Sequence, residues 1–271
     1  MKKVIILKLG GSIITQKHRD GVFIRRTLLS RIAKEIHDVV KKNSELQLII
    51  IHGAGAAGHQ TAKKYRLEKG TGDDKKKMRG ALLIREANQK LNLAVSKIFT
   101  DSGVKVVPVH TSSIIIQKDG EMASFLYTTL ESAISAQFVP ILYGEMVFDT
   151  TLGMSICSGD IIAIHLAKHF KAAKILFASD VDGIYDKDPH TYQNAKIIRS
   201  VLLKNLLTNK NIELSGSHHI DVTGGMRNKI ASIIKNGIPK TLKEVAVFNG
   251  LKNNALTKAF AGKNEGTIIA I

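Results

Sequence analysis

The feature that most constrains the fold of this sequence is the regular alternation of short apolar runs with longer segments of helical periodicity. Apolar runs of about four to eight residues are typical of buried strands, whereas apolar residues at every third or fourth position indicate amphipathic helices. Such an alternation favours a mostly parallel sheet covered by helices on both faces. Buried strands are predicted at residues 4–9, 46–51, 104–109, 139–143, 174–178, 244–249 and 266–271, and helices at 24–42, 78–102, 160–170 and 223–234.

The composition is that of a globular protein. With 271 residues, 44% of them hydrophobic, the chain is long enough to bury a substantial core, and we expect a single domain spanning residues 1–271. A single cysteine, Cys157, forms no intramolecular disulfide, which favours a reducing compartment. The N-terminus lacks the apolar stretch of about 7–15 residues that a secretory signal needs, and no run approaches the ~18 residues of a membrane span. We therefore expect a soluble, cytoplasmic protein without stable membrane insertion.

The net charge points to anionic ligands. Lys and Arg total 40 against 23 acidic residues, which gives a net charge of +17. This balance favours nucleic acid, an acidic membrane surface or phosphorylated small molecules. The lysines are scattered along the chain, however, and the sequence has no Trp to serve as a stacking platform. We therefore expect small phosphorylated ligands and no nucleic-acid partner.

The first strand ends in a lysine followed by two glycines. Lys8 precedes Gly10 and Gly11, so an ammonium group lies beside exposed backbone N–H groups. This combination suits the oxygens of a phosphate. The alternative is an ordinary strand-end lysine in solvent before a glycine turn.

A second glycine-rich loop follows the second strand and ends in His59. Gly53, Gly55 and Gly58 formally satisfy the dinucleotide-binding pattern G-x-G-x-x-G. That interpretation is disfavoured, because the loop follows the second strand and no later strand ends in an acidic residue about 20 positions on. A glycine-rich turn at a helix N-terminus still favours an anion. His59 is expected either to donate a hydrogen bond to that anion or to be purely structural.

Three further loops carry polar residues. Ser158-Gly159-Asp160 precedes an apolar helix, so it either caps that helix or supplies a carboxylate that orients lysines. The acidic segment 180–189 fails the calcium-loop pattern, because its glycine comes too early. The segment 221–229 offers another glycine-rich helix start, with Lys229 one turn inside. No Walker A motif is present, so any nucleoside triphosphate site is not a P-loop.

Taken together and in order, these five segments resemble the amino acid kinase superfamily. They read K-x-G-G-S, a Gly-rich loop after the second strand, S-G-D, D-V-D-G-I-Y-x-x-D-P and D-V-T-G-G-M-x-x-K, and they span residues 8–229. The resemblance implies a three-layer αβα sandwich around an open, mostly parallel sheet. It also implies that a lobe of about residues 1–170 binds the phosphoryl acceptor and that residues 171–271 bind ATP.

Within the superfamily, the chain looks like the isopentenyl phosphate kinases. These share the histidine that closes the second loop, here His59, and a lysine soon after G-G-S, here Lys17. Fosfomycin kinase has the same histidine-bearing loop and is the nearest alternative. The chain departs from the pattern in having Ala54 for the second glycine, Ala56-Ala57 for Ser-Phe, and Ile161 where a second Asp is usual.

The resemblance implies a role for each matching residue. Lys8 would bridge the transferred phosphoryl group and the acceptor, and Lys229 would hold the β- and γ-phosphates. Asp160 would orient the lysines, His59 would bind the acceptor phosphate, and Lys17 would add charge near the γ-phosphate. The remaining implied contacts are Gly10, Gly11, Ser12, Gly55, Asp180 and Gly225 with ATP, and Ala54 and Gly159 with the acceptor.

The resemblance also implies ATP with Mg²⁺ as the cofactor and a homodimer as the assembly, while no all-protein metal site is predicted. The non-enzyme alternative is a protein that senses or stores nucleotides or oxyanions. The joint presence of Lys8, Asp160 and Lys229 argues against it, because a binding protein needs no aligned transfer apparatus.

Overall fold

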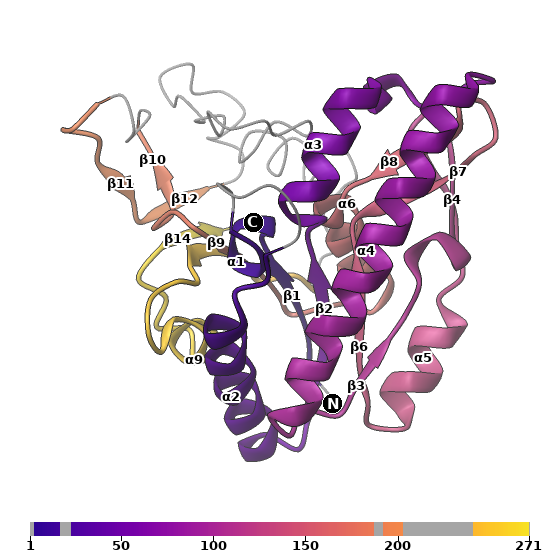
Figure 1. Cartoon of the computed structure of the whole chain (residues 1–271). Helices are drawn as coiled ribbons and strands as arrows, with labels where there is room; N and C mark the ends of the chain where they lie inside the picture. The colour runs from indigo at the N-terminus through magenta and orange to yellow at the C-terminus, as the bar shows by residue number, and fades with distance from the viewer. Residues whose placement is uncertain (1–2, 17–22, 187–191, 203–240, 271) are drawn as a thin grey trace.

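The computed structural model describes residues 3–16, 23–186, 192–202 and 241–270. Eight of its strands form one sheet: β1 (Lys3–Leu9), β2 (Leu46–His52), β3 (Val106–Pro108), β6 (Val139–Tyr143), β9 (Lys174–Ser179), β12 (Ser200–Leu202), β13 (Glu244–Asn249) and β14 (Thr267–Ala270). Their order is β12-β14-β13-β9-β1-β2-β6-β3, and every neighbouring pair is parallel except β13 with β14. The predicted mostly parallel sheet is confirmed (Figure 1).

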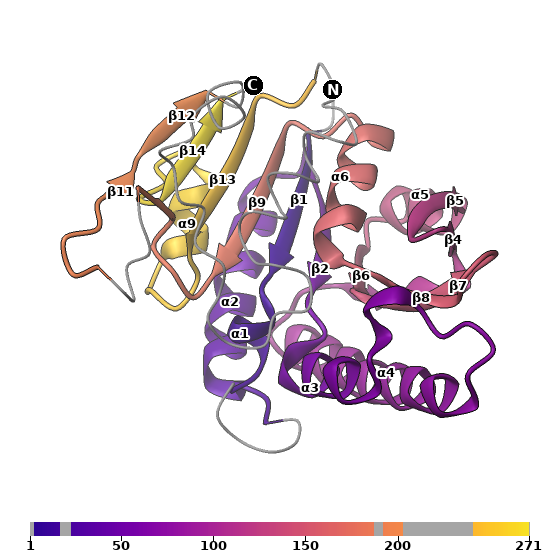
Figure 2. The ribbon, with the colours of Figure 1, turned by 90° about the horizontal axis from the view of Figure 1, so that it is seen from above.

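Helices cover both faces of this sheet. They are α1 (Gly11–Ile14), α2 (Arg26–Lys42), α3 (Gly55–Tyr65), α4 (Lys75–Asp101), α5 (Thr128–Ser135), α6 (Gly159–His169) and α9 (Ala255–Phe260). Because side chains alternate along a strand, Ile5 and Leu7 of β1 face a cluster with α2, α4 and α9. Val4 and Ile6 face a cluster with α5 and α6. The arrangement is the predicted three-layer αβα sandwich, which can be followed in Figures 1 and 2.

A second sheet, which the sequence analysis missed, lies at the far end of the molecule from β12 and β14 (Figures 1 and 2). Its strands are β4 (Ile115–Lys118), β5 (Glu121–Phe125), β7 (Glu145–Asp149) and β8 (Gly153–Cys157), in the order β5-β4-β7-β8. Asp119 and Gly120 join β4 to β5, and both have positive φ, 52° and 76°. An Asp-Gly pair with positive φ is the usual signal of a two-residue hairpin turn, so this pair was the available clue.

Asp149 ties the turns of this second sheet together. Its carboxylate accepts hydrogen bonds from the N–H groups of Gly120 (2.8 Å), Thr151 (2.9 Å) and Leu152 (2.9 Å). Burial alone would raise the pKa of Asp149, but these N–H donors and the Ser155 hydroxyl outweigh it and lower the pKa to about 2. The carboxylate is therefore a structural clamp between two turns.

The other predicted elements need only boundary corrections. The long helix begins at Lys75 rather than at residue 78, because the Asp74 carboxylate caps it by accepting from the N–H groups of Lys76 (2.8 Å) and Lys77 (3.0 Å). The strands predicted at 104–109 and 266–271 shorten to Val106–Pro108 and Thr267–Ala270. The predicted helix at 223–234 lies outside the described residues. A two-stranded sheet of β10 (Ile184–Tyr185) and β11 (Ile197–Ile198) completes the described strands.

Candidate functional site

The centre of the candidate site is a buried ion pair between Lys8 and Asp160. Lys8 stands near the carboxyl end of β1 and Asp160 in the first turn of α6. The Lys8 Nζ and Asp160 Oδ1 atoms are 2.9 Å apart, and each residue is 7% exposed. Ser158 begins α6 by accepting a hydrogen bond from the Ile161 N–H (3.2 Å), so helix capping and ion pairing both occur in this loop. Burying an ion pair costs desolvation free energy, so such a pair is more often found at a functional site than in an ordinary core. This pair lies at the carboxyl end of the central strand β1, where ligands bind in open α/β sheets, and it therefore marks a candidate active site.

Glycines allow the surrounding loops to approach this ion pair. A Cβ atom on Gly53 would lie 2.8 Å from the Gly11 nitrogen, and one on Gly11 would lie 3.3 Å from the Gly55 Cα atom. A Cβ atom on Gly159 would lie 3.5 Å from the Lys8 side chain and 3.1 Å from that of Ile51. Larger residues at Gly11, Gly53 or Gly159 would therefore separate the loops that follow β1, β2 and β8.

The remaining predicted residues take up positions around this centre. Gly10 donates from its N–H to the Ala178 carbonyl (2.8 Å), which brings the loop after β1 to the end of β9. Asp180 follows directly after β9 and is half-buried, and its Oδ1 accepts from the Ser179 hydroxyl at 3.4 Å. Ser12 is half-buried in α1. Ser12 and Asp180 thus flank the point where the chain after β1 meets the end of β9, at Gly10.

The second glycine loop, residues 53–58, leads into the start of α3. It is named the anion loop, because a glycine-rich turn at a helix start favours an anion. Ala54 is the N-cap of α3 and Gly55 its first residue, with a φ of 68° that favours glycine. His59 lies one turn further along and is half-buried. The structure therefore places His59 on the helix that begins at the anion loop, as the sequence predicts.

Three predicted site residues cannot be placed. Lys17, Gly225 and Lys229 lie outside the described residues. Their roles remain predictions from the family resemblance.

His52 is a site-adjacent residue that the sequence analysis missed. It ends β2, it is fully buried, and its ring stacks on that of Tyr143 with 5.4 Å between the centroids. Burial, opposed in part by hydrogen bonds to Gly53 and Asn92, lowers the pKa of His52, and the positive charge of Lys8 lowers it further. His52 is therefore a neutral imidazole beneath the loop. Its position directly before Gly53 was the only available signal.

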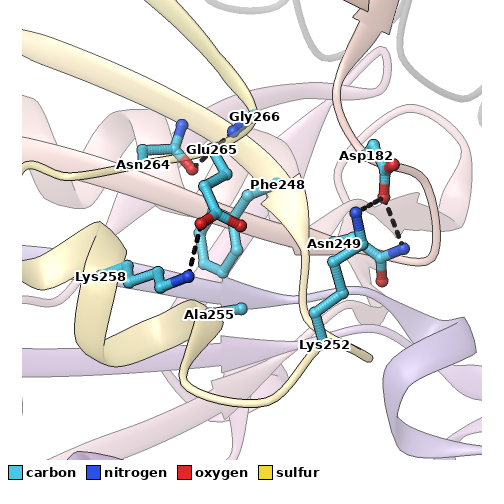
Figure 3. A pocket seen from close by; sticks show the side chains of 9 residues that line it. All are labelled: Asp182, Phe248, Asn249, Lys252, Ala255, Lys258, Asn264, Glu265 and Gly266. Atoms are coloured by element: carbon cyan, nitrogen blue, oxygen red, sulfur yellow. Dashed lines mark hydrogen bonds and ion pairs between the residues drawn. The ribbon is translucent and has the colours of Figure 1, made fainter.

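A small pocket lies apart from the ion pair, at the carboxyl end of β13 (Figure 3). Its lining includes Asp182, whose Oδ1 accepts from Asn249 Nδ2 (2.9 Å) and from Lys252 Nζ (2.8 Å). The hydrogen bond from Lys252 lowers the pKa of Asp182. The second lysine of the pocket, Lys258, pairs with Glu265. Since each lysine faces a carboxylate, this pocket offers no excess positive charge to a phosphate.

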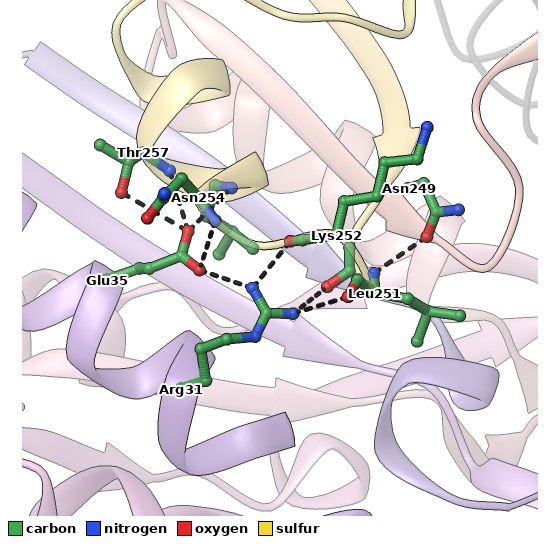
Figure 4. Close-up of polar contacts among 9 residues, drawn as sticks. Arg31, Glu35, Asn249, Leu251, Lys252, Asn254 and Thr257 are labelled. Carbon is green, nitrogen blue, oxygen red and sulfur yellow. Dashed lines mark hydrogen bonds and ion pairs between the residues drawn. The ribbon is translucent and has the colours of Figure 1, made fainter. Parts of the chain in front are cut away.

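A second ion pair, between the half-buried Arg31 and the buried Glu35 on α2, holds the loop after β13 (Figure 4). The Arg31 guanidinium donates to the carbonyls of Gly250 (2.9 Å), Leu251 (3.1 Å) and Lys252 (2.7 Å). The Glu35 carboxylate accepts N–H groups at the start of α9, those of Asn254 (3.1 Å), Leu256 (3.1 Å) and Thr257 (3.2 Å). This network joins α2 to the loop between β13 and α9.

The sequence matches the profile of the Amino acid kinase family over residues 3–238. The chain belongs to this family. Among curated proteins it is 36% identical to the isopentenyl phosphate kinase of Methanocaldococcus jannaschii, over 97% of both chains. It is 30% identical to the isopentenyl phosphate kinase of Methanothermobacter thermautotrophicus, over 96% of this chain and 97% of that one.

Solved structures give the same result for this amino acid kinase family member. A crystal structure of isopentenyl phosphate kinase superposes with a TM-score of 0.80 at 26% identity, covering 98% of this chain and 100% of the other. The isopentenyl phosphate kinase substrate complex superposes with a TM-score of 0.77 at 26% identity, covering 98% and 99%. The predicted superfamily, its isopentenyl phosphate kinase-like branch and the fold class are confirmed.

Within the described ranges, no three His, Cys, Asp or Glu side chains converge in a way that would hold a metal ion. None of the helices in the described part of the chain combines the length and the apolar character needed to cross a bilayer.

Proposed function

We propose that this protein transfers the γ-phosphoryl group of ATP to isopentenyl phosphate, giving isopentenyl diphosphate and ADP. The observation that carries the proposal is the buried Lys8–Asp160 ion pair among glycine loops. It occurs in a chain that is 36% identical, over nearly its whole length, to a curated isopentenyl phosphate kinase. The reaction class is that of a phosphotransferase with a phosphate group as acceptor.

The proposed chemistry depends on positioning and on charge. An acceptor phosphate oxygen is already anionic at neutral pH, so it attacks the γ-phosphorus without a general base. The new P–O bond forms as the bond to the β,γ-bridging oxygen breaks and ADP leaves. The main obstacle is the repulsion between two anions, which an aligned ammonium group offsets. Asp160 holds the Lys8 ammonium at 2.9 Å, so this cation is fixed before the substrates meet.

The other roles in this proposal come from the family resemblance. Gly11 and Gly55 supply backbone donors, and Asp180 lies near the nucleotide. Gly10, whose N–H is bonded to the Ala178 carbonyl, contributes by leaving room for ATP beside the loop. Lys17, Gly225 and Lys229 complete the phosphate contacts from outside the described residues. We assign the acceptor to residues 1–170 and the nucleotide to residues 171–271 of one domain. A cytoplasmic homodimer is part of the same proposal.

We propose that Mg²⁺ arrives with ATP. Magnesium in phosphoryl-transfer sites is usually held by one or two carboxylates together with phosphate oxygens and water. Asp180, half-buried directly after β9, is a carboxylate that suits this donor set. When bound, the ion would neutralise charge on the β- and γ-phosphates.

The proposed acceptor has an anionic head and an apolar tail. His59 offers an imidazole to the phosphate. One turn further along α3, Ala62 packs in a buried apolar cluster with Ile84 of α4, Met146 of β7 and Met154 of β8. A hydrocarbon tail needs apolar surroundings, so we assign the tail to the neighbourhood of this cluster.

A coupled assay of ADP release tests the function. The purified protein is supplied with ATP, Mg²⁺ and, in separate reactions, isopentenyl phosphate, dimethylallyl phosphate, fosfomycin or aspartate. We expect the highest kcat/KM with isopentenyl phosphate. A higher value with fosfomycin or aspartate would assign the protein to another branch of the family. ATP binding without turnover of any acceptor would indicate a nucleotide-binding protein.

A further inference from the structure

The buried ring of His52 connects the anion loop to two neighbouring elements. Its Nδ1 atom lies 2.9 Å from the carbonyl oxygen of Gly53, the first residue of the loop. Its Nε2 atom lies 3.0 Å from the Oδ1 atom of Asn92 on α4. The ring stacks on Tyr143 of β6 at an interplanar angle of 18°, and the whole residue is inaccessible to solvent. This ring therefore has one fixed orientation.

The hydrogen-bond partners also fix the tautomer of His52. A carbonyl oxygen only accepts hydrogen bonds, so Nδ1 must carry the proton that bonds to Gly53. Burial and Lys8 favour the neutral form, so Nε2 carries no proton and accepts. This assignment requires the Asn92 amide to be turned by 180°, so that its nitrogen takes the position at which Oδ1 faces the ring. His52 is thus a neutral, fixed donor aimed at one loop carbonyl.

That donor determines how the next peptide group points. The peptide bond between Gly53 and Ala54 is trans and planar, so the Gly53 carbonyl and the Ala54 N–H point in opposite directions. When His52 holds the carbonyl inward, the Ala54 N–H faces the side of the loop away from the buried ring. Ala54 is the N-cap of α3, so its N–H lies outside the hydrogen-bond pattern of that helix.

The rest of the loop start is already fixed by other contacts. The Gly53 N–H donates to the Leu9 carbonyl at 3.0 Å, and Gly53 packs against the Gly11 backbone. The contacts to Leu9 and Gly11 fix the position of Gly53. They do not fix the rotation of the peptide plane between Gly53 and Ala54, which depends on the partner that bonds to the Gly53 carbonyl. His52 is the side chain that bonds to this carbonyl.

We propose that His52 is a positioning residue, whose Nδ1–H bond to the Gly53 carbonyl directs the Ala54 N–H toward an anionic oxygen of the acceptor. This inference rests on the proposed function, because the donor matters only where an acceptor anion meets this loop. His52 itself touches no reacting atom. Its effect is expected in acceptor binding and not in ATP binding.

Three variants separate positioning from packing. His52→Asn keeps an N–H donor at the Nδ1 position, since its amide nitrogen is the same number of bonds from Cα. His52→Gln carries its amide further out, toward Asn92, and loses the donor to Gly53. Asn92→Leu, the matched control, removes the α4 partner and keeps the Gly53 bond. Dissociation constants for isopentenyl phosphate and for inorganic phosphate are measured by calorimetry, and KM and kcat by ADP release.

We expect His52→Gln to weaken the binding of both anions about tenfold, the value of one net hydrogen bond, with the KM for ATP changed less than about threefold. His52→Asn and Asn92→Leu should bind both anions within about threefold of the wild type, even where their thermal stability falls. Equal anion affinity for His52→Gln and His52→Asn would overturn the inference, as would a wild-type protein that binds neither anion. If the wild type binds these anions but does not phosphorylate isopentenyl phosphate, the proposed function fails. In that case the anion affinities of His52→Gln and His52→Asn, compared with the wild type, still decide the role of His52.

Discussion

Asp160 and Glu35 are buried to the same extent, 7% and 8% exposed, and each forms an ion pair with a basic side chain. The Asp160–Lys8 pair measures 2.9 Å and the Glu35–Arg31 pair 2.6 Å. Burial and ion pairing therefore do not distinguish the two carboxylates. Their surroundings do.

The carboxylate of Glu35 is occupied by backbone N–H groups at the start of α9, and Arg31 is occupied by three carbonyls of the preceding loop. Such a network fixes two elements to each other. The Lys8–Asp160 pair lies instead beside loops that approach one another closely at Gly11, Gly53 and Gly159, because these residues have no side chains. A cation next to the backbone N–H groups of glycine loops suits an anionic ligand. We therefore propose that the Arg31–Glu35 pair serves stability and the Lys8–Asp160 pair serves the reaction.

The largest effect is expected at Lys8. Lys8→Ala should lower kcat by at least ~100-fold with a modest loss of ATP affinity, because it removes charge stabilisation that matters most in the transition state. Steady-state ADP release measures kcat, and equilibrium ATP binding measures the affinity.

The control for this prediction is Arg31→Ala, which breaks the other ion pair. It should reduce stability while leaving kcat within about threefold, because Arg31 bonds to the loop after β13 and not to the residues around Lys8. Folding of both variants is verified by circular dichroism. Near-normal turnover in a folded Lys8→Ala protein would remove the distinction between the two pairs.

The sequence allowed one of these ion pairs to be predicted and not the other. Lys8 stands at the end of a predicted strand and Asp160 at the start of a predicted helix, and the family resemblance implies that Asp160 orients the lysines. Glu35 and Arg31 are spaced like any exposed helical ion pair. Their decisive partners are backbone groups of residues 250–257, more than 200 positions away in the sequence. No local pattern encodes such a contact.

The elements of the fold show the same limit. Long parallel strands and amphipathic helices were predictable from periodicity, because each buries a face that the sequence displays. The strands of the second sheet have only four or five residues each and mix exposed with buried positions, so only Asp119-Gly120 signalled a turn. His52 was not predicted because its role depends on Asn92 and Tyr143, which only the folded chain brings to it.

His59 should give the next largest effect. His59→Ala should raise the acceptor KM or lower kcat by roughly 10–150-fold, the cost of one charge-assisted hydrogen bond of about 1.5–3 kcal/mol, with ATP binding changed less than about threefold. His59→Gln keeps an N–H donor and should retain part of the activity. Steady-state kinetics with isopentenyl phosphate checks both.

Gln60→Ala, one position further on the same helix, is the matched control and should behave like the wild type. Equal losses of ATP and acceptor binding in His59→Ala would indicate a structural histidine. Activity on an amino acid that is unaffected by His59→Ala would place the acceptor in a different branch of the family.

A smaller effect, on stability alone, is expected at Glu35. Glu35→Gln should lower the free energy of unfolding by about 1–2 kcal/mol, because it discharges the pair with Arg31 and places an amide nitrogen among N–H donors. Urea unfolding measures the change. Glu86→Gln, in an exposed helical pair with Lys90, should cost less than about 0.5 kcal/mol. A fall of more than about threefold in kcat for Glu35→Gln would show that the Arg31–Glu35 network also serves the reaction.

The smallest effect concerns Glu145, a third buried carboxylate, which is 2% exposed and accepts the Ser112 N–H at 3.0 Å. Burial raises the pKa of Glu145 above its ordinary value of 4.5, and the hydrogen bond from Ser112 opposes the shift without cancelling it. The folded protein therefore keeps this proton to a higher pH than the unfolded chain does.

The sign of the pH dependence follows from that difference. Between pH 4.5 and the raised pKa, the folded state binds more protons at Glu145 than the unfolded state, so this group contributes less stability as the pH rises. Glu145→Gln removes the titration. Urea unfolding over this range should therefore show the stability of Glu145→Gln improving relative to the wild type as the pH increases. The opposite slope would mean that Glu145 is stabilised in its ionised form.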